Sequence, residues 1–347
     1  MNLESGFGQG ASSTAGATLN LADDYQVYGS YGIDSDRTLG RSRKISTIGQ
    51  RKSFGNRLTL FNEHQWVHGQ YESVASDVFG IDLGLGEHWK VSTSLQTNDT
   101  DVSGQNTNRR AATLGLSYQK EQQRLGATLE RRIDETSVNE FEQWLFTGAF
   151  EYKFNDAWRS VSRLNWSETD DEVNGGRAAR FTEGSVGFAY RPVNFDRWNM
   201  LARYTYLFDL VSPDQQVNRP DQESHIGSVE VLFDANKRWE FGAKLALRRS
   251  RLRIDRDTGP WFENGVNLAV ARARYHVNHK WDGLIEYRYL ETVEFNDSRD
   301  GALIGLYRHL GGNLKLGAGY NFTDYSDDLT NLDYDGGGWY VDLIGKW

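Results

Sequence analysis

Polar turns recur along this 347-residue chain, and each precedes a large apolar residue that opens a run of alternating apolar and polar residues. Four of these opening residues are Tyr25, Leu58, Leu125 and Leu314, and consecutive openings lie 31 to 42 residues apart. The other five are tryptophans: Trp89, Trp158, Trp198, Trp239 and Trp281. Each interval is the length of two strands, a loop and a tight turn. Alternating segments of about ten residues joined in this way are the sequence signature of a transmembrane β-barrel.

The two faces of each expected strand differ in chemistry. After Trp239, Phe241 and Leu245 fall on one face, whereas Lys244 and Arg248 fall on the other, because successive side chains of a strand point to opposite sides. A soluble β-sandwich would turn its polar face to water and its apolar face to a second sheet. The recurring tryptophan and the uniform hairpin order favour a barrel with lipid outside and water inside. The expected girdle at the periplasmic membrane edge comprises Trp89, Trp158, Trp198, Trp239, Trp281 and Trp347.

The last nine residues, Trp339 to Trp347, alternate in the same way. A C-terminal amphipathic strand that ends on an aromatic residue resembles the assembly signal of bacterial outer-membrane barrels. The resemblance implies that the barrel-assembly machinery reads this strand. It also implies the bilayer and lipopolysaccharide as partners of the folded chain.

Nineteen strands can be identified between residues 12 and 347. Because single-chain bacterial barrels have an even number, residues 2–8 are expected to add a partial strand and complete twenty. The predicted fold class is all-β, a transmembrane antiparallel up-and-down β-barrel of about 18 to 20 strands. Residues 1–11 would be an N-terminal remnant or partial strand, and residues 12–347 the barrel. Since no charged and apolar leader opens the sequence, we expect either a removed signal peptide or the C-terminal part of a longer protein.

Two stretches resemble a known kind of protein. The run from Tyr190 to Leu207, with RPVNFDRW at 191–198, is similar to a motif in the C-terminal barrels of large Gram-negative surface proteins. The hairpin from Phe54 to His64 resembles those barrels too. The resemblance implies an outer-membrane anchor behind a long repeat-bearing region, and it brings no catalytic residues.

Composition agrees with the bacterial outer membrane and disfavours other classes. No run of eighteen apolar residues occurs, so no membrane-spanning helix is expected. The formal net charge is -9, and the lack of a basic face argues against a nucleic-acid partner. The four prolines fall in expected turns or loops, as a hydrogen-bonded ladder requires.

Motifs that carry chemistry are sparse. No nucleophile motif or phosphate-binding loop occurs and the histidines lack metal-ligand spacing, so we expect no enzyme activity, no catalytic residue, no cofactor and no metal site. His225 with Asp221 and Glu223 is the grouping that an outer-membrane enzyme would use. The acidic stretches Asp255–Gly259 and Asp324–Asp335 have the oxygen-rich character of Ca²⁺ loops, although solvated acid is the ordinary interpretation.

Charged residues on the polar faces give the most specific functional indication. Rows of mixed charge would orient polar solutes in a wide pore, and they would equally serve as the ordinary salt-bridged interior of a barrel. A barrel of about 18 to 20 strands is too wide for side chains alone to fill. Water, an inserted loop, an N-terminal segment or another protein would then occupy the lumen. The predicted pore-lining residues are Arg159, Arg163, Arg203, Glu240, Lys244, Arg248, Arg272, Arg274, Asp282, Glu286 and Arg288.

Three classes of function follow from these patterns. Porin-like passage of small hydrophilic solutes is the first, because it requires nothing outside this chain. The alternative is an anchor or conduit barrel that holds, exports or encircles a partner or its own N-terminal region. Porins usually narrow the lumen with a long inward loop, whereas the loops at 209–223, 250–263 and 324–337 are of moderate length, which favours the alternative or an unusually open pore. An outer-membrane enzyme is the third class.

Overall fold

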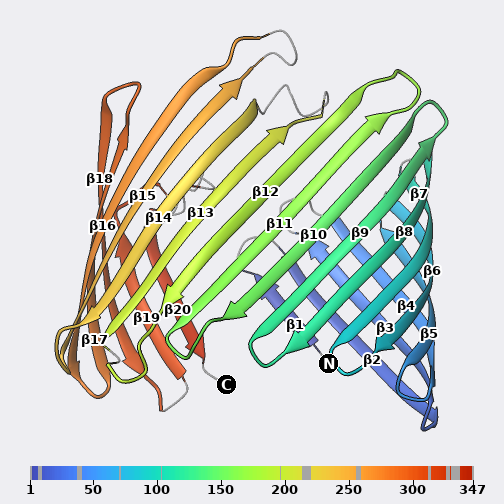
Figure 1. The fold of residues 1–347 in the computed structure, drawn as a ribbon, viewed down its shortest axis with the longest axis horizontal. Coiled ribbons are helices and arrows are strands. Elements are labelled where there is room, and N and C mark those ends of the chain that lie inside the picture. The colour runs from blue at the N-terminus through green and yellow to red at the C-terminus, as the bar shows by residue number, and fades with distance from the viewer. Residues whose placement is uncertain are drawn as a thin grey trace. The chain divides into compact units, whose positions relative to one another are not determined.

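The computed structural model describes residues 2–6, 10–36, 41–69, 72–102, 104–195, 197–212, 220–254, 259–311, 314–325, 329 and 337–345. Within them the chain forms twenty β-strands (Figure 1). The strands are β1 (Asn2–Gly6), β2 (Gly10–Ala22), β3 (Tyr25–Asp36), β4 (Arg41–Phe54), β5 (Leu58–Gly69), β6 (Glu72–Leu85), β7 (Trp89–Val102), β8 (Gln105–Lys120), β9 (Gln123–Thr136), β10 (Glu140–Lys153), β11 (Trp158–Asp171), β12 (Arg177–Tyr190), β13 (Trp198–Leu210), β14 (Asp221–Asp234), β15 (Trp239–Arg253), β16 (Phe262–Asn278), β17 (Trp281–Thr292), β18 (Asp297–His309), β19 (Leu314–Asn321) and β20 (Gly338–Gly345). In these residues, no helix is long and apolar enough to cross a membrane.

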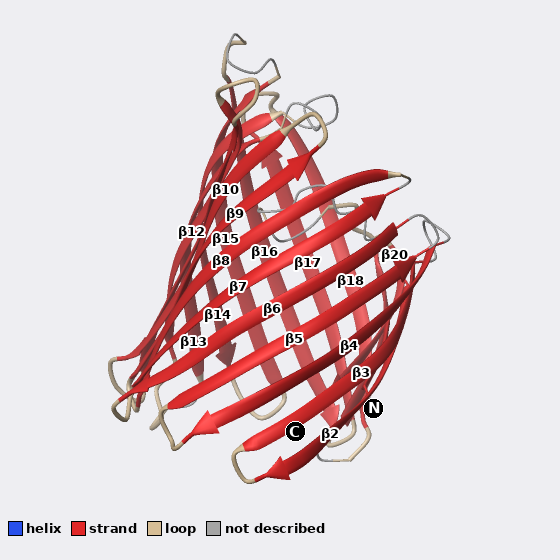
Figure 2. Ribbon diagram, turned by 90° about the vertical axis from the view of Figure 1, so that its right-hand side faces the viewer, coloured by secondary structure: helices blue, strands red, loops and turns tan. Residues whose placement is uncertain are grey.

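The strands form one antiparallel sheet in which neighbours along the chain pair with each other. This pairing runs from β1 to β9 and again from β13 to β20. Figure 2 shows β5, β6, β7 and β8 side by side in chain order. The partial strand expected near the N-terminus is β1, with Asn2 opposite Thr14 of β2. The predicted all-β, up-and-down class and the total of twenty strands are therefore confirmed.

Most strands begin where the sequence pattern predicts and extend further than it predicts. Eight of the nine opening residues are the first residue of a strand, and the exception is Leu125, because β9 begins at Gln123. Most of the segments expected to have about ten residues are longer, and β8 and β16 reach 16 and 17 residues, whereas β19 and β20 have 8 residues each. The reason is that backbone pairing continues through polar residues such as Gln105 to Arg109, where the apolar alternation has already ended.

Asparagine side chains fix three of the tight turns. The Asn155 Oδ1 atom accepts hydrogen bonds of 2.9 Å from the backbone N–H groups of Ala157 and Trp158. Asn236 binds the N–H of Trp239 in the same way at 3.1 Å, and Asn278 binds that of Lys280 at 2.8 Å. Asparagine thus stands three residues before Trp158, Trp239 and Trp281, and its side chain replaces a backbone acceptor in the turn. This Asn-x-x-Trp signal adds a local cause for the turns that the sequence analysis located only by their polarity.

The chain divides into two compact units. The first comprises Met1–Phe150 with Asn165–Arg180, and the second Glu151–Leu164 with Phe181–Trp347. All eleven predicted pore-lining residues belong to the second unit. Its strands have an inner face, which carries Arg248 and Glu286, and an outer face, which carries Leu245 and Ile285. An apolar cluster on the inner face consists of Ile226, Ala246, Val266, Leu268, Val270, Leu290, Tyr325 and Leu329.

Candidate functional site: the inner face of the second unit

Alternation along β15 and β17 separates two environments. On the outer face Leu245 is 65% exposed and Ile285 57%, whereas on the inner face Arg248 and Glu286 are each 6% exposed. The strand period of two therefore buries the charged side chains and exposes the aliphatic ones, which is the reverse of a soluble sheet. The alternation also predicts an outward direction for Phe150, Leu164, Phe241 and Leu343, and all four are exposed.

The outer-face placement of Leu245 leads to a first prediction. We expect Leu245→Arg to lower the free energy of unfolding of the bilayer-inserted chain by about 2–4 kcal/mol, because a cation near the membrane midplane loses its hydration. Lys244→Arg on the adjacent inner position is the matched control, with an expected change of less than about 0.5 kcal/mol. Urea unfolding in lipid vesicles measures both. Equal stability of the two variants would place Leu245 away from lipid.

Strand register brings the predicted acids and bases of the inner face together. Arg272 of β16 lies opposite Glu286 of β17, and its guanidinium is 3.4 Å from that carboxylate and 3.3 Å from Glu230 of β14. The Arg288 Nε atom donates a 2.6 Å hydrogen bond to Glu286. Arg274 binds Glu240 of β15 at 3.0 Å. Five strands, β14 to β18, contribute to this face, and ion pairs link four of them.

Asp282 is the centre of a second charged cluster on the inner face. Its side chain is 2% exposed, and it accepts hydrogen bonds from Lys315 Nζ at 2.6 Å. The rings of His276 and His309 lie 2.7 and 2.8 Å from its two oxygens. The partners come from β16, β18 and β19, so the carboxylate joins four strands near the turns. Sequence reasoning predicted the lumenward direction of Asp282, but it considered the histidines only for metal-ligand spacing and so missed these contacts.

Residues that follow β19 lie against the inner face. Leu329 and Tyr325 are 2% and 3% exposed and belong to the apolar cluster on β14 to β17. Arg248 Nη1 donates a 2.9 Å hydrogen bond to the carbonyl of Leu329, and the Tyr325 hydroxyl donates one of 3.2 Å to the carbonyl of Arg299. Burial raises the pKa of Tyr325 to about 12, so its phenol stays neutral at physiological pH. We call the described residues Thr323 to Tyr325 and Leu329 the inserted segment.

The remaining predicted pore-lining residues are more open. Arg159 pairs with Glu151 at 3.1 Å. Arg163 and Arg203 are exposed, and Arg203 shares its face of β13 with the buried Thr205 and Leu207. Lys244 lies opposite Glu230 on β14 and Val270 on β16. A part in solute passage stays a prediction for all eleven residues.

Five tryptophans of the expected girdle begin their strands, and four of these pack on a ring of the next strand. Trp89 contacts Tyr118 with 4.6 Å between ring centroids, and Trp198 contacts Phe233 at 4.4 Å. Trp158 with Tyr190 and Trp239 with Tyr275 repeat the arrangement. Trp281 differs, because the Arg308 guanidinium lies over its ring. Trp347 lies outside the described residues. The partner rings, which the sequence analysis missed, are also large apolar residues near a strand end and so carried a recognisable signal.

The grouping considered for an enzyme is divided among other contacts. The His225 Nδ1 atom is 2.7 Å from the Tyr204 hydroxyl. Asp221 binds Arg253 at 2.9 Å, and Glu223 pairs with Arg251. The two acidic stretches considered for Ca²⁺ lie mostly outside the described residues. Within the described part of the chain, His, Asp and Glu form no group suited to holding a metal ion.

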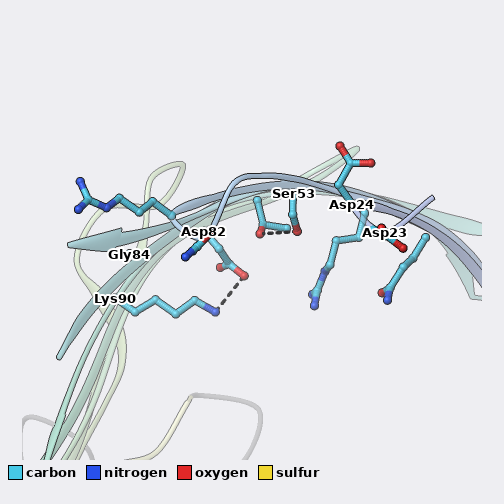
Figure 3. A pocket seen from close by; sticks show the side chains of 11 residues that line it. Asp23, Asp24, Ser53, Asp82, Gly84 and Lys90 are labelled. Carbon is cyan, nitrogen blue, oxygen red and sulfur yellow. Dashed lines mark hydrogen bonds and ion pairs between the residues drawn. The ribbon is translucent and has the colours of Figure 1, made fainter. Parts of the chain in front are cut away.

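The first unit has a polar pocket of about 450 Å³ at its turns (Figure 3). The pocket is lined from the β2–β3 turn, the β4–β5 turn and the adjoining ends of β6 and β7. The Lys90 ammonium lies 3.0 Å from the Asp82 carboxylate, and the hydroxyls of Ser53 and Thr59 are 3.1 Å apart. Acids and bases balance locally, so the pocket has no single charge preference that would identify a ligand.

Comparisons with known proteins bear on the fold. The sequence matches no protein-family model and no curated protein. The structure is similar to the alcaligin outer-membrane receptor FauA from Bordetella pertussis, with a TM-score of 0.54 and 11% identity over 97% of this chain and 73% of that one. It is similar to the copper transporter OprC, with a TM-score of 0.54 and 10% identity over 98% of this chain and 70% of that one. For the FrpB iron transporter from Neisseria meningitidis the TM-score is 0.50, with 8% identity over 96% and 71%.

At these identities the likeness shows the fold alone. The chain has the antiparallel β-barrel fold of Gram-negative outer-membrane receptors and transporters. This is the fold class and the outer-membrane kind of protein that the sequence predicts, and both are confirmed at that level.

Proposed function

We propose that this chain is a non-enzymatic outer-membrane transport barrel that passes small hydrophilic solutes along the charged inner face of its second unit. The observation that carries the proposal is the pairing of this inner face with the inserted segment. Ion-paired side chains on β14 to β17 provide a polar wall, and Tyr325 and Leu329 lie against it. Similarity to receptors and transporters supports transport in general.

The inner face suits small polar solutes better than apolar ones. Arg272, Arg288 and Glu286 present charge to the interior, and Tyr307 donates a 3.2 Å hydrogen bond to Asp342. Fixed charges of both signs orient dipoles and order water without binding one sign of ion tightly. The hydrogen bond from Arg248 to the carbonyl of Leu329 supports a narrowed passage, since a segment held against the inner face would restrict it as an inward loop does.

An anchor or conduit barrel is the second candidate. The resemblance of Tyr190 to Leu207 to the C-terminal barrels of large surface proteins supports it, since those barrels tether a long region. In this candidate the inserted segment would keep the interior closed until a partner or an N-terminal region displaces it. The bilayer, lipopolysaccharide and the assembly machinery are proposed partners of either kind of barrel.

Planar-bilayer recording on the purified chain distinguishes the pore from the anchor or conduit. For a pore we expect steady single-channel conductance that changes with salt beyond the change in bulk conductivity, because wall charges are screened over about 10 Å at 0.1 M. Heat-unfolded protein in the same detergent is the control for leaks. A chain that inserts and folds yet stays closed at all salt concentrations would contradict the pore and favour the anchor or conduit.

A further inference from the structure

An apolar hollow crosses the outer face of the second unit from β15 to β20. Its volume is about 580 Å³, and its lining includes Ala273, Gly283, Ile285, Leu306, Ala318 and Tyr320. Small residues form its floor, since Gly283 lies between Tyr275 and Leu306, and Leu306 lies opposite Ala318. Larger side chains, Trp239 and Trp339 among them, stand around it. The volume and the apolar lining of the hollow suit a hydrocarbon chain.

Cations lie at the turn end of the same face. Arg308 is two residues beyond Leu306 on β18, is exposed, and lies 5.5 Å from the centre of the Trp281 ring. Lys280, in the turn before Trp281, and Lys237 and Arg238, in the turn before Trp239, are exposed as well. Basic residues next to a membrane attract anionic headgroups by about 1 kcal/mol each, so this end has the charge that complements a lipid phosphate.

We propose that the hollow and Arg308 together form a binding site for one anionic phospholipid. An acyl chain lies along Gly283 and Ala318, and the phosphate is bound by the Arg308 guanidinium beside Trp281. Aromatic rings at the membrane interface pack against the glycerol region while the guanidinium neutralises the phosphate. The inference rests on the membrane-spanning fold and is independent of whether the barrel conducts.

Gly283 offers a clean way to fill the hollow. A Cβ atom added there meets no heavy atom within 4 Å, so a larger side chain enters open space without displacing the backbone. Gly227 on β14 is equally open and also lies on the outer face, opposite Tyr204 and Leu247 in a separate hollow. Gly283→Leu therefore fills the hollow where the acyl chain would lie, and Gly227→Leu is the matched control.

Native mass spectrometry of the full chain in detergent, titrated with dioleoylphosphatidylglycerol, tests the site. We expect one retained lipid on the wild type, and about fivefold weaker retention for Arg308→Gln. Gly283→Leu should weaken retention as well, whereas Gly227→Leu should match the wild type. The wild type should retain less dioleoylphosphatidylcholine than the anionic lipid. The Arg308→Gln variant should retain the two lipids equally.

Three outcomes would overturn the site. Equal retention of the anionic lipid by all four proteins would show that the lipid is non-specific annular lipid. Equal retention of both lipids by the wild type would show the same. Crosslinking of two chains across the hollow would assign it to a second copy instead. Heat-dependent gel migration verifies that each variant is folded. If Gly283→Leu does not fold, the substitution of the exposed Arg308 by glutamine still tests the site. Bilayer conductance is measured separately from lipid retention. A variant that loses the lipid but keeps its conductance, or keeps the lipid but loses its conductance, therefore distinguishes this inference from the proposed pore.

Discussion

Replacing Leu329 by aspartate is expected to raise the single-channel conductance of the purified chain several-fold. Leu329 is 2% exposed and packs in the apolar cluster with Val266, Leu268 and Leu290. A carboxylate in that position would lie among these aliphatic side chains and lose its hydration, which costs several kcal/mol and favours release of the inserted segment. The strands themselves keep their pairing, because the segment contributes no backbone hydrogen bond to the ladder from β14 to β17.

Planar-bilayer recording gives the measurement, with Val173→Asp as the control. Val173 is 59% exposed in the turn between β11 and β12, so the same change there should leave the conductance unaltered. Tyr325→Ala should act in the same direction as Leu329→Asp, since Tyr325 is 3% exposed and belongs to the same cluster. A folded Leu329→Asp variant with wild-type conductance would show that the inserted segment does not limit passage.

Removing the buried carboxylate of Asp282 is expected to cause a large loss in the free energy of unfolding. Asp282→Ala leaves the Lys315 ammonium, whose side chain is 17% exposed, without its 2.6 Å partner, and it removes the contacts with His276 and His309. Breaking a buried ion pair by removing one partner costs about 3–5 kcal/mol, because the other charge stays desolvated. We expect a loss near the lower end, about 3 kcal/mol, since both histidine rings are partly exposed.

Urea unfolding in vesicles, followed by tryptophan fluorescence, measures the change. Asp156→Ala is the matched control: Asp156 pairs with Lys153 at 2.6 Å but is 79% exposed, and exposed pairs contribute little to stability. The Lys153 ammonium lowers the pKa of Asp156, yet solvent surrounds the pair in this turn. If both alanine variants lost the same stability, Asp282 would not be the junction that its burial indicates.

The alternation of residues was sufficient to predict the strands and their faces. Phe241 and Leu245 lie outward and Lys244 and Arg248 inward because a strand has a period of two, whatever its neighbours are. The opening residues, five of them tryptophans, located eight strand starts for a related reason: the turn before each is a local structure, fixed in three cases by an asparagine three residues upstream. Nineteen of the strands followed from the same local signals, and the twentieth followed from the even number of strands in single-chain bacterial barrels.

Only the tertiary structure decided which of these residues meet. Asp282 joins His309 and Lys315, 27 and 33 residues away, because the register of β17, β18 and β19 aligns them. Leu329 reaches Arg248 across 81 residues of sequence, and nothing in an acidic, glycine-rich loop predicts that one leucine turns inward. The outward hollow depends in the same way on Gly283 of β17 and Ala318 of β19 both falling opposite Leu306 of β18. Strand periodicity is a property of one segment, whereas register and loop folding depend on contacts between segments, so the sequence determined the faces of this protein and the tertiary structure determined its sites.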